Sequence, residues 1–179
     1  MQDHVSTILE QWRRQRPDLD VSPVGVFGRI SRIDRHKATA LREVYRRHDC
    51  DAGEYDVLAA LRRTGPPHEL TPTELSRTVL VNSATMTERL TRLEQRGLVL
   101  RTRSDTDRRS VSVGLTTAGR DLIDSAVRDL LASETRLLDG LTDADQRALA
   151  RLLAKLAGDL DAKEISARGV RARHDWDNT

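Results

Sequence analysis

The chain is poor in cysteine, in aromatic residues and in long apolar runs, and each shortage excludes a class of protein. Cys50 is the only cysteine in the 179 residues, so no intrachain disulfide can form and we expect a reducing, cytoplasmic setting. Aromatic residues make up 3% of the chain, which disfavours a sheet that stacks unpaired bases. No apolar run approaches the roughly 20 residues of a membrane span, and the N-terminus lacks the apolar core of a signal peptide. We therefore expect no membrane association.

The residue types that usually carry catalysis form no recognisable pattern. The five histidines and the cysteine lack metal-ligand spacing, and there is neither a nucleophile motif nor a glycine-rich phosphate loop. The sequence thus predicts no enzyme, no cofactor and no metal site. Two interpretations of Cys50 stay open: an unreactive thiol near a helix end, or a redox-sensitive thiol whose pKa is lowered by the cations at 46–48.

Charge at helical spacing dominates what is present. Charged residues make up 32% of the chain, and apolar residues recur every three or four positions, which is typical of amphipathic helices. The pattern predicts a short helix over 5–16, a long helix over 23–48 and a helix that begins at Asp51. Two further helices are expected to begin after Thr116 and after Thr142. The net charge of +2 is too small to indicate a nucleic-acid partner by itself, so the distribution of charge must decide.

The middle of the chain predicts a helix-turn-helix. Thr71, Pro72 and Glu74 place an N-cap hydroxyl, an N1 proline and an N3 glutamate in register, which indicates a helix start. A tight turn follows this short helix, and a second helix is expected over 83–96, closed by Gly97. Two short helices joined by such a turn form the DNA-reading unit of many regulators.

The segment after Gly97 changes period and predicts a β-hairpin. Two β-prone runs, 98–103 and 110–115, flank a polar and charged connection, so the hairpin has a basic tip. Extended arginines on a protruding hairpin suit a narrow minor groove. The fold class expected is therefore mainly α, a winged helix-turn-helix with a two-stranded β wing.

The face of the 83–96 helix opposite its apolar stripe carries small and polar groups that can approach base edges. Read alone, such a face is also that of an ordinary solvated helix; its place between a capped helix and a basic hairpin favours DNA. The DNA contacts predicted are Ser83, Ala84, Thr85, Thr87, Glu88, Thr91 and Arg92 on the helix, and Arg101, Arg103, Arg108 and Arg109 on the hairpin.

The first and last helices carry more aliphatic surface than a small winged helix can cover. We therefore expect them to form a dimerisation region. The organisation predicted is a single domain over 1–164, with an extra N-terminal helix at 1–16, dimerisation helices at 23–49 and 117–164, and the winged helix at 51–116. Residues 165–179 show no apolar period and are expected to be a flexible tail.

Together these motifs resemble the MarR family of winged helix-turn-helix regulators. The resemblance covers about residues 24–160 and rests on the capped helix at 70–75, the run 92–99, the wing residues 107–109 and the run 115–120. It implies a homodimer on a pseudo-palindromic double-stranded operator, usually a repressor released by a small ligand.

The extra N-terminal helix is similar to that of the urate-responsive, PecS-type branch of this family. The resemblance implies a ligand site at Trp12, Asp56 and Arg89, with Asp34 at the position where the branch has a histidine. An anion stacked on Trp12 would compete with Asp56 for Arg89 and shift the recognition helix. Urate, another organic anion or a phenolic compound are the ligands considered, since an acid at Asp34 disfavours a second negative group.

Several alternatives remain open at this stage. Trp12 can be a simple anchor of its helix, and Asp56 and Arg89 a plain ion pair. The row Arg29, Arg32 and Arg35 is either a solvated face or an anion-binding cluster. A constitutive or architectural DNA-binding protein without an effector is the alternative function. A helical adaptor that has lost DNA binding is disfavoured by the arginines of the wing.

Overall fold

The computed structural model describes residues 3–103 and 111–176. The described part is mainly helical, with three short strands, as the sequence predicts. The chain divides into two compact units, Met1–Glu134 and Thr135–Thr179, and each is described by itself. The single domain expected over 1–164 therefore stays a prediction.

The N-terminal helix α1 (His4–Gln15) packs against α2 (Ser22–Arg47). Val5 and Leu9 on α1 and Val21 before α2 form a small core of their own. The apolar stripe predicted on the first helix thus buries two of its members, which is enough to hold a 12-residue helix that would be marginal alone.

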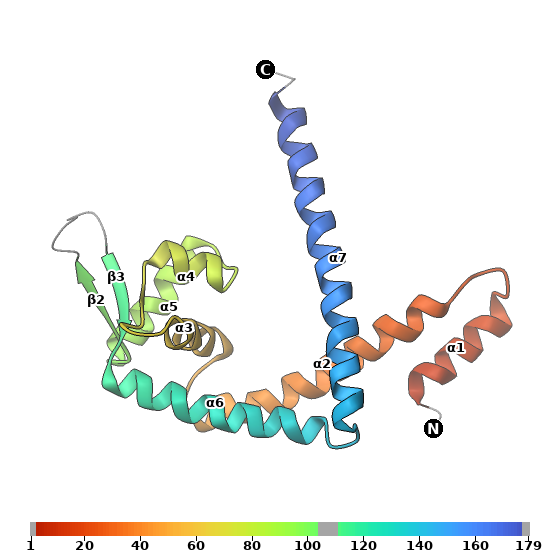
Figure 1. Cartoon of the computed structure of the whole chain (residues 1–179), viewed down its shortest axis with the longest axis horizontal. Coiled ribbons are helices and arrows are strands. Elements are labelled where there is room, and N and C mark those ends of the chain that lie inside the picture. Colours follow the sequence, from red (N-terminus) through yellow and green to blue (C-terminus); the bar gives the residue numbers. More distant parts are fainter. Residues whose placement is uncertain (1–2, 104–110, 177–179) are drawn as a thin grey trace. The chain divides into compact units, whose positions relative to one another are not determined.

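Three helices form the compact centre of the first unit: α3 (Ala52–Arg63), α4 (Pro72–Thr78) and α5 (Ser83–Gln95). The helices α3 and α4 both begin with a capping box, at Asp51 and Thr71 respectively. In each box the N-cap side chain accepts from the N3 amide, and the N3 glutamate accepts from the N-cap amide. Figure 1 shows these helices gathered beside the strands, with α6 leading away from them.

The wing is part of a three-stranded antiparallel sheet of order β1-β3-β2. Strands β2 (Val99–Arg103) and β3 (Val111–Leu115) form the predicted hairpin. The two-stranded wing is thus confirmed, and a further strand that the sequence did not predict, β1 (Glu69–Leu70), pairs with β3. Two residues are too few to display the alternation by which strands are recognised in a sequence.

One contiguous core joins the three central helices to the sheet and to the start of α6. Its largest fully buried side chains are aliphatic or methionine, as expected for a chain with so few aromatic residues. They include Leu58, Leu61, Leu75, Met86, Leu90, Leu93, Val113 and Ile123. This core fixes α5 against α3.

Helix α6 (Thr117–Leu137) connects this unit with the second one. Ion pairs tie its first-unit portion to the preceding helices: Arg62 to Asp124, with Nε and Oδ1 2.7 Å apart, and Lys37 to Glu134, with Nζ and Oε1 3.3 Å apart. The sequence-predicted helix behind Thr116 is thus present and is attached to both α2 and α3.

The second unit consists of the end of α6 and the long helix α7 (Asp143–Trp176). Thr142 caps α7, with its hydroxyl accepting from the amide of Asp145 at 3.2 Å. The helix continues over 165–176, where the sequence predicts a flexible tail.

Candidate DNA interface and ligand cavity

The predicted recognition helix is α5, and its polar face is turned outward. Asn82 caps it by accepting from the Thr85 amide at 2.9 Å, and Met86, Leu90 and Leu93 are buried. Thr85 itself is half-buried. The exposed residues of the opposite face are Ser83, Ala84, Thr87, Glu88 and Thr91. This is the surface a helix needs in a major groove, and contact of these residues with DNA stays a prediction.

Arg92, also predicted to contact DNA, is surrounded by carboxylates. Its guanidinium nitrogens lie 2.8 Å from Glu88, 3.1 Å from Asp51 and 3.5 Å from Glu54. Arg96, one turn later, lies 2.8 Å from the same Glu54. The last turns of α5 are therefore tied to the first turn of α3.

Arg101 on β2 lies against the recognition helix. Its Nε is 3.3 Å from Glu94 Oε2, and its Nη2 donates to Thr91 Oγ1 at 3.2 Å. It therefore connects the wing to α5, which supports the angle between the two elements. The other predicted wing contacts, namely the Arg103 side chain, Arg108 and Arg109, lie outside the described residues.

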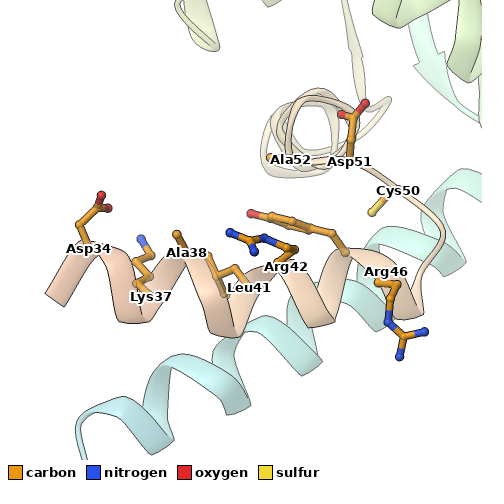
Figure 2. A pocket seen from close by; sticks show the side chains of 10 residues that line it. Asp34, Lys37, Ala38, Leu41, Arg42, Arg46, Cys50, Asp51 and Ala52 are labelled. Atoms are coloured by element: carbon orange, nitrogen blue, oxygen red, sulfur yellow. The ribbon is translucent and has the colours of Figure 1, made fainter. Parts of the chain in front are cut away.

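A cavity of about 650 Å³ lies between α2 and the start of α3. Figure 2 shows Asp34, Ala38 and Arg42 on the side of α2 that faces Asp51 and Ala52, whereas Arg46 points to the other side. The lining residues are Asp34, Lys37, Ala38, Leu41, Arg42, Tyr45, Arg46, Cys50, Asp51 and Ala52. The lining combines Leu41 and two alanines with charged side chains of both signs, a phenol and a thiol. The volume lies within the range of small-molecule sites.

The cations around this cavity differ in how they are neutralised. Lys37 pairs with Glu134 at 3.3 Å, and Arg46 pairs with Glu43 at 2.8 Å. Arg42 has no ion pair within the described part of the chain. It is therefore a cavity cation whose charge is not neutralised by an ion pair in that part of the chain.

Tyr45 and Cys50 are the cavity's titratable donors that are neutral at pH 7. Burial raises the pKa of the Tyr45 phenol, with a further contribution from the negative charge of Asp56. The Tyr45 ring also packs on that of Tyr55, with centroids 5.4 Å apart. Burial, followed by repulsion from Glu54, raises the pKa of the Cys50 thiol to about 11. The pKa is raised rather than lowered, which favours the unreactive interpretation of this thiol.

The four residues assigned to ligand binding by resemblance are not gathered in one place. Asp34 lines the cavity. Asp56 and Arg89 interact electrostatically, but no ion pair joins them in the described region; burial outweighs Arg89 and raises the pKa of the Asp56 carboxyl. The guanidinium of Arg89 packs where a Cβ at Gly53 would stand. Trp12 is 48% exposed on α1 and is absent from the cavity wall.

The arginine row on α2 does not form an anion cluster that includes Arg29. Its guanidinium donates to both carboxylate oxygens of Asp3, at 2.9 and 3.0 Å, and to the Gly25 carbonyl at 2.8 Å. Arg32 and Arg35 are exposed. Arg29 is therefore a clamp that holds α1 on α2.

Other kinds of site find no support in the part of the chain that the structure describes. Over residues 3–103 and 111–176, no three His, Cys, Asp or Glu side chains come together in a way that would hold a metal ion. Within the same residues, no helix has the length and apolar character needed to cross a membrane.

Sequence reasoning missed the residues that tie these surfaces together. The spacing from Asp51 to Glu54 identified a capping box, but it did not reveal that Glu54 faces two arginines of α5. Arg42 and Tyr45 stand four and seven residues beyond Ala38 on one face of α2, a spacing that could have suggested a shared surface. Nothing local indicated that α3 would cover that surface.

Comparison with known proteins identifies relatives along most of the chain. The family model described as "MarR family" matches residues 51–111. The transcriptional regulator PecS of Dickeya dadantii (strain 3937) is 38% identical over 152 residues, which cover 85% of this chain and 92% of PecS.

Solved structures agree with this result. A mutant of Escherichia coli MarR complexed with operator DNA superposes with a TM-score of 0.65 at 26% identity, covering 77% of this chain and 99% of that one. Bordetella bronchiseptica BpsR, whose DNA binding is regulated by 6-hydroxynicotinic acid, gives a TM-score of 0.63 at 25% identity, covering 74% and 92%.

Proposed function

The chain belongs to the MarR family and is a DNA-binding transcriptional regulator rather than an enzyme; from that premise we propose a dimeric repressor, released by a small organic anion. As a dimer it reads a pseudo-palindromic double-stranded operator, with one α5 in each half-site. The anion, of an aromatic or phenolic class, binds in the cavity between α2 and α3.

The main support for operator recognition is that the polar face of α5 is exposed. Its small and hydroxyl-bearing residues are exposed, while its apolar side is locked into the core. The similarity to MarR on operator DNA supports the same use of the helix here. The DNA contacts predicted on this helix that belong to this proposal are Ser83, Ala84, Thr85, Thr87, Glu88 and Thr91.

Dimerisation is supported by apolar side chains that are exposed in each unit. On α2, Phe27 is 52% and Ile33 60% exposed; on α7, Leu152 is 61% and Leu160 49% exposed. Such large aliphatic and aromatic surfaces are costly in water and are typical of obligate interfaces. The two-fold axis of a dimer would match the symmetry of the operator.

Release by an anion is supported by the chemistry of the cavity and by one relative. Arg42 offers a guanidinium without an ion pair in the described region, and Tyr45 offers a neutral hydroxyl on an aromatic ring, beside the aliphatic Leu41 and two alanines. This combination suits an aromatic carboxylate or a comparable organic anion. Control of BpsR by 6-hydroxynicotinic acid is a precedent at 25% identity.

A route from the cavity to the DNA-reading helix is also present. Asp51 both lines the cavity and accepts from Arg92 of α5 at 3.1 Å. A ligand that shifts the start of α3 would therefore act on a residue bonded to the recognition helix. The ligand could weaken operator binding by at most the difference between its affinities for the shifted and unshifted states.

The test is a binding titration of the purified protein. Fluorescence anisotropy would compare the region upstream of its own coding sequence with random duplex, at low and high salt, with and without urate or 6-hydroxynicotinate. We expect preferential, salt-sensitive binding that one of these anions weakens. Binding that no organic anion changes would favour the constitutive regulator, and no preference over random duplex at any promoter would contradict the operator proposal.

The Arg42→Met variant tests whether the anion releases the protein from DNA by binding in this cavity. It should bind the operator like the wild type and respond poorly to the anion. Arg46→Met is the matched control, because Arg46 is neutralised by Glu43 and points away from α3. Equal responses of the two variants would place the ligand elsewhere.

A further inference from the structure

The recognition helix ends in two arginines that point back to α3. Arg92 lies in the last turn of α5 and Arg96 is the C-cap residue with helical backbone angles, so the two, four residues apart, share one helix face. Arg92 Nε lies 3.5 Å from Glu54 Oε1, and Arg96 Nη1 donates to Glu54 Oε2 at 2.8 Å. One carboxylate thus engages two successive turns of the helix.

Glu54 is buried, although it is charged. The residue is 5% exposed, and its Oε2 also accepts from the Asp51 amide at 3.3 Å in the capping box of α3. A buried carboxylate is tolerated only with partners that satisfy its charge. Here the partners are supplied by its own helix and by α5, so its position depends on both.

Neighbouring groups restrict the same contact further. Arg92 reaches Asp51 at 3.1 Å, and Arg96 reaches the backbone carbonyl and the carboxylate of Asp49. The arginines therefore meet acceptors on three residues of the α2–α3 connection and of the first turn of α3. Rotation of α5 about its axis would break several of these bonds together.

We propose that Glu54 is a positioning residue for operator recognition, which sets the rotation of α5 through Arg92 and Arg96 without touching DNA. The proposal rests on the function proposed above, because it concerns how α5 reads an operator. In this proposal Arg92 binds Glu54 of α3, in place of the DNA contact that the sequence suggested. A positioning role affects preference for the correct sequence more than attraction to phosphate, because phosphate contacts carry no sequence information.

The variant that isolates this role is Glu54→Gln. The amide oxygen of glutamine still accepts from the Asp51 backbone, so the capping box survives, but the charge that faces the two arginines is lost. By electrostatics alone, removal of a negative charge from a DNA-binding unit strengthens binding to every duplex. The positioning role predicts a loss of operator preference instead.

The operator used is the sequence that the wild-type protein selects from a random duplex library. We expect E54Q to lower the ratio of operator affinity to random-duplex affinity by about tenfold or more, about the effect of one mismatched base pair. The dependence of binding on salt should stay as in the wild type. Arg92→Gln should lower the same affinity ratio. If Arg92 instead contacted phosphate, this substitution would weaken binding to all duplexes and reduce the slope of log affinity against log salt concentration by about 1.

Glu74→Gln is the matched control. Glu74 occupies the equivalent position in the capping box of α4, but it is exposed and has no ion pair with an arginine in the described region. It should keep the operator preference. Circular dichroism and thermal unfolding check that each variant folds; if E54Q does not, Arg96→Gln removes one partner and leaves Arg92 to satisfy the carboxylate.

The outcomes separate the two proposals. If the wild type selects no sequence, the proposed operator function fails. If the wild type selects an operator and folded E54Q keeps its preference within about twofold, a difference too small for a positioning role, Glu54 is only a structural cap and this inference is overturned.

Discussion

Leu80 stands in the turn before the recognition helix in a backbone conformation that leucine rarely adopts. Its φ is +56°, and its side chain is 89% exposed, so no burial compensates for the strain. We expect Leu80→Gly to raise the free energy of unfolding by up to about 1 kcal/mol, because strain of about 1–2 kcal/mol is partly offset by the greater freedom of glycine when unfolded.

Urea denaturation measures this change. Leu100→Gly is the control, since Leu100 is 59% exposed but lies in β2. It should be destabilising, as glycine is within a strand. If both variants lose stability equally, the strain at Leu80 is not real.

The Cys50 thiol should react slowly. A pKa of about 11, against a usual value of 9.0, reduces the thiolate fraction at neutral pH about 100-fold, while the greater nucleophilicity of the more basic thiolate recovers about tenfold. Reaction with a disulfide reagent at pH 7.5 should therefore be about tenfold slower than that of free cysteine. A rate equal to that of free cysteine or faster would restore a redox role for this residue.

At the scale of elements, the junction of the wing with α6 depends on Gly119. A Cβ at this position would overlap the carbonyl oxygen of Leu98, a backbone atom that cannot swing aside. Thr116 Oγ1 also donates to the Gly97 carbonyl at 2.7 Å, which draws the start of α6 onto the end of the recognition segment. The sequence run at 115–120 that resembles the family thus encodes a close contact between two elements.

Gly119→Ala should consequently lower the free energy of unfolding by about 1–3 kcal/mol, the usual cost of overpacking. Ala118→Ser, exposed in the same turn, should change it by less than about 0.5 kcal/mol. Thermal unfolding of both variants checks the difference. Equal stabilities would mean that α6 can move away from Leu98 at little cost.

The docking of α1 should weaken in acid. Hydrogen bonds from Ser6, followed by the ion pair with Arg29, lower the pKa of Asp3 to about 2 from 3.8. A carboxyl whose pKa is lowered by folding contributes stability above its unfolded pKa and loses it as the pH falls through the folded value. The contribution of Asp3 should therefore be complete above about pH 4 and disappear toward pH 2.

Amide hydrogen exchange in α1 measures this docking. Asp3→Asn should increase exchange in α1 at pH 7 and leave the exchange of α3 unchanged, because α1 has its own small core. Arg14→Gln on the same helix, which is exposed, serves as the control. If the α1 amides of the D3N variant exchange as slowly as those of the wild type, the Asp3–Arg29 pair does not hold this helix.

At the scale of the whole molecule, the apolar faces of α2 and α7 predict an obligate dimer. Ile33→Asp and Leu152→Asp each place a charge on a residue that is about 60% exposed in the single chain, which is harmless unless a partner covers it. We expect both variants to shift the protein toward the monomer and to reduce operator affinity, while the winged helix stays folded. Sedimentation velocity gives the mass, and Ser31→Asp on α2 is the exposed control. Variants that remain dimeric would show that the interface lies elsewhere.

The sequence by itself determined where the capped helices of the winged helix begin, and its motifs resembled the family that the comparisons then showed. Capping boxes at Asp51 and Thr71, the stop at Gly97 and the period change behind it are signals carried by residues within four positions of each other. Such signals depend on backbone hydrogen bonds that form locally, so they can be recognised without the fold. The same locality explains why β1, with only two residues, was missed.

Only the tertiary structure decided which charges meet. The chain has 30 basic and 28 acidic residues, and no local rule selects the pairing of Glu54 with Arg92 and Arg96, about 40 residues away. The cavity likewise exists because α3 covers a face of α2 that the sequence shows only as a mixture of basic and aliphatic residues. Long-range pairs are fixed by how the core orients whole helices, because their attraction is weak until burial removes the competing water.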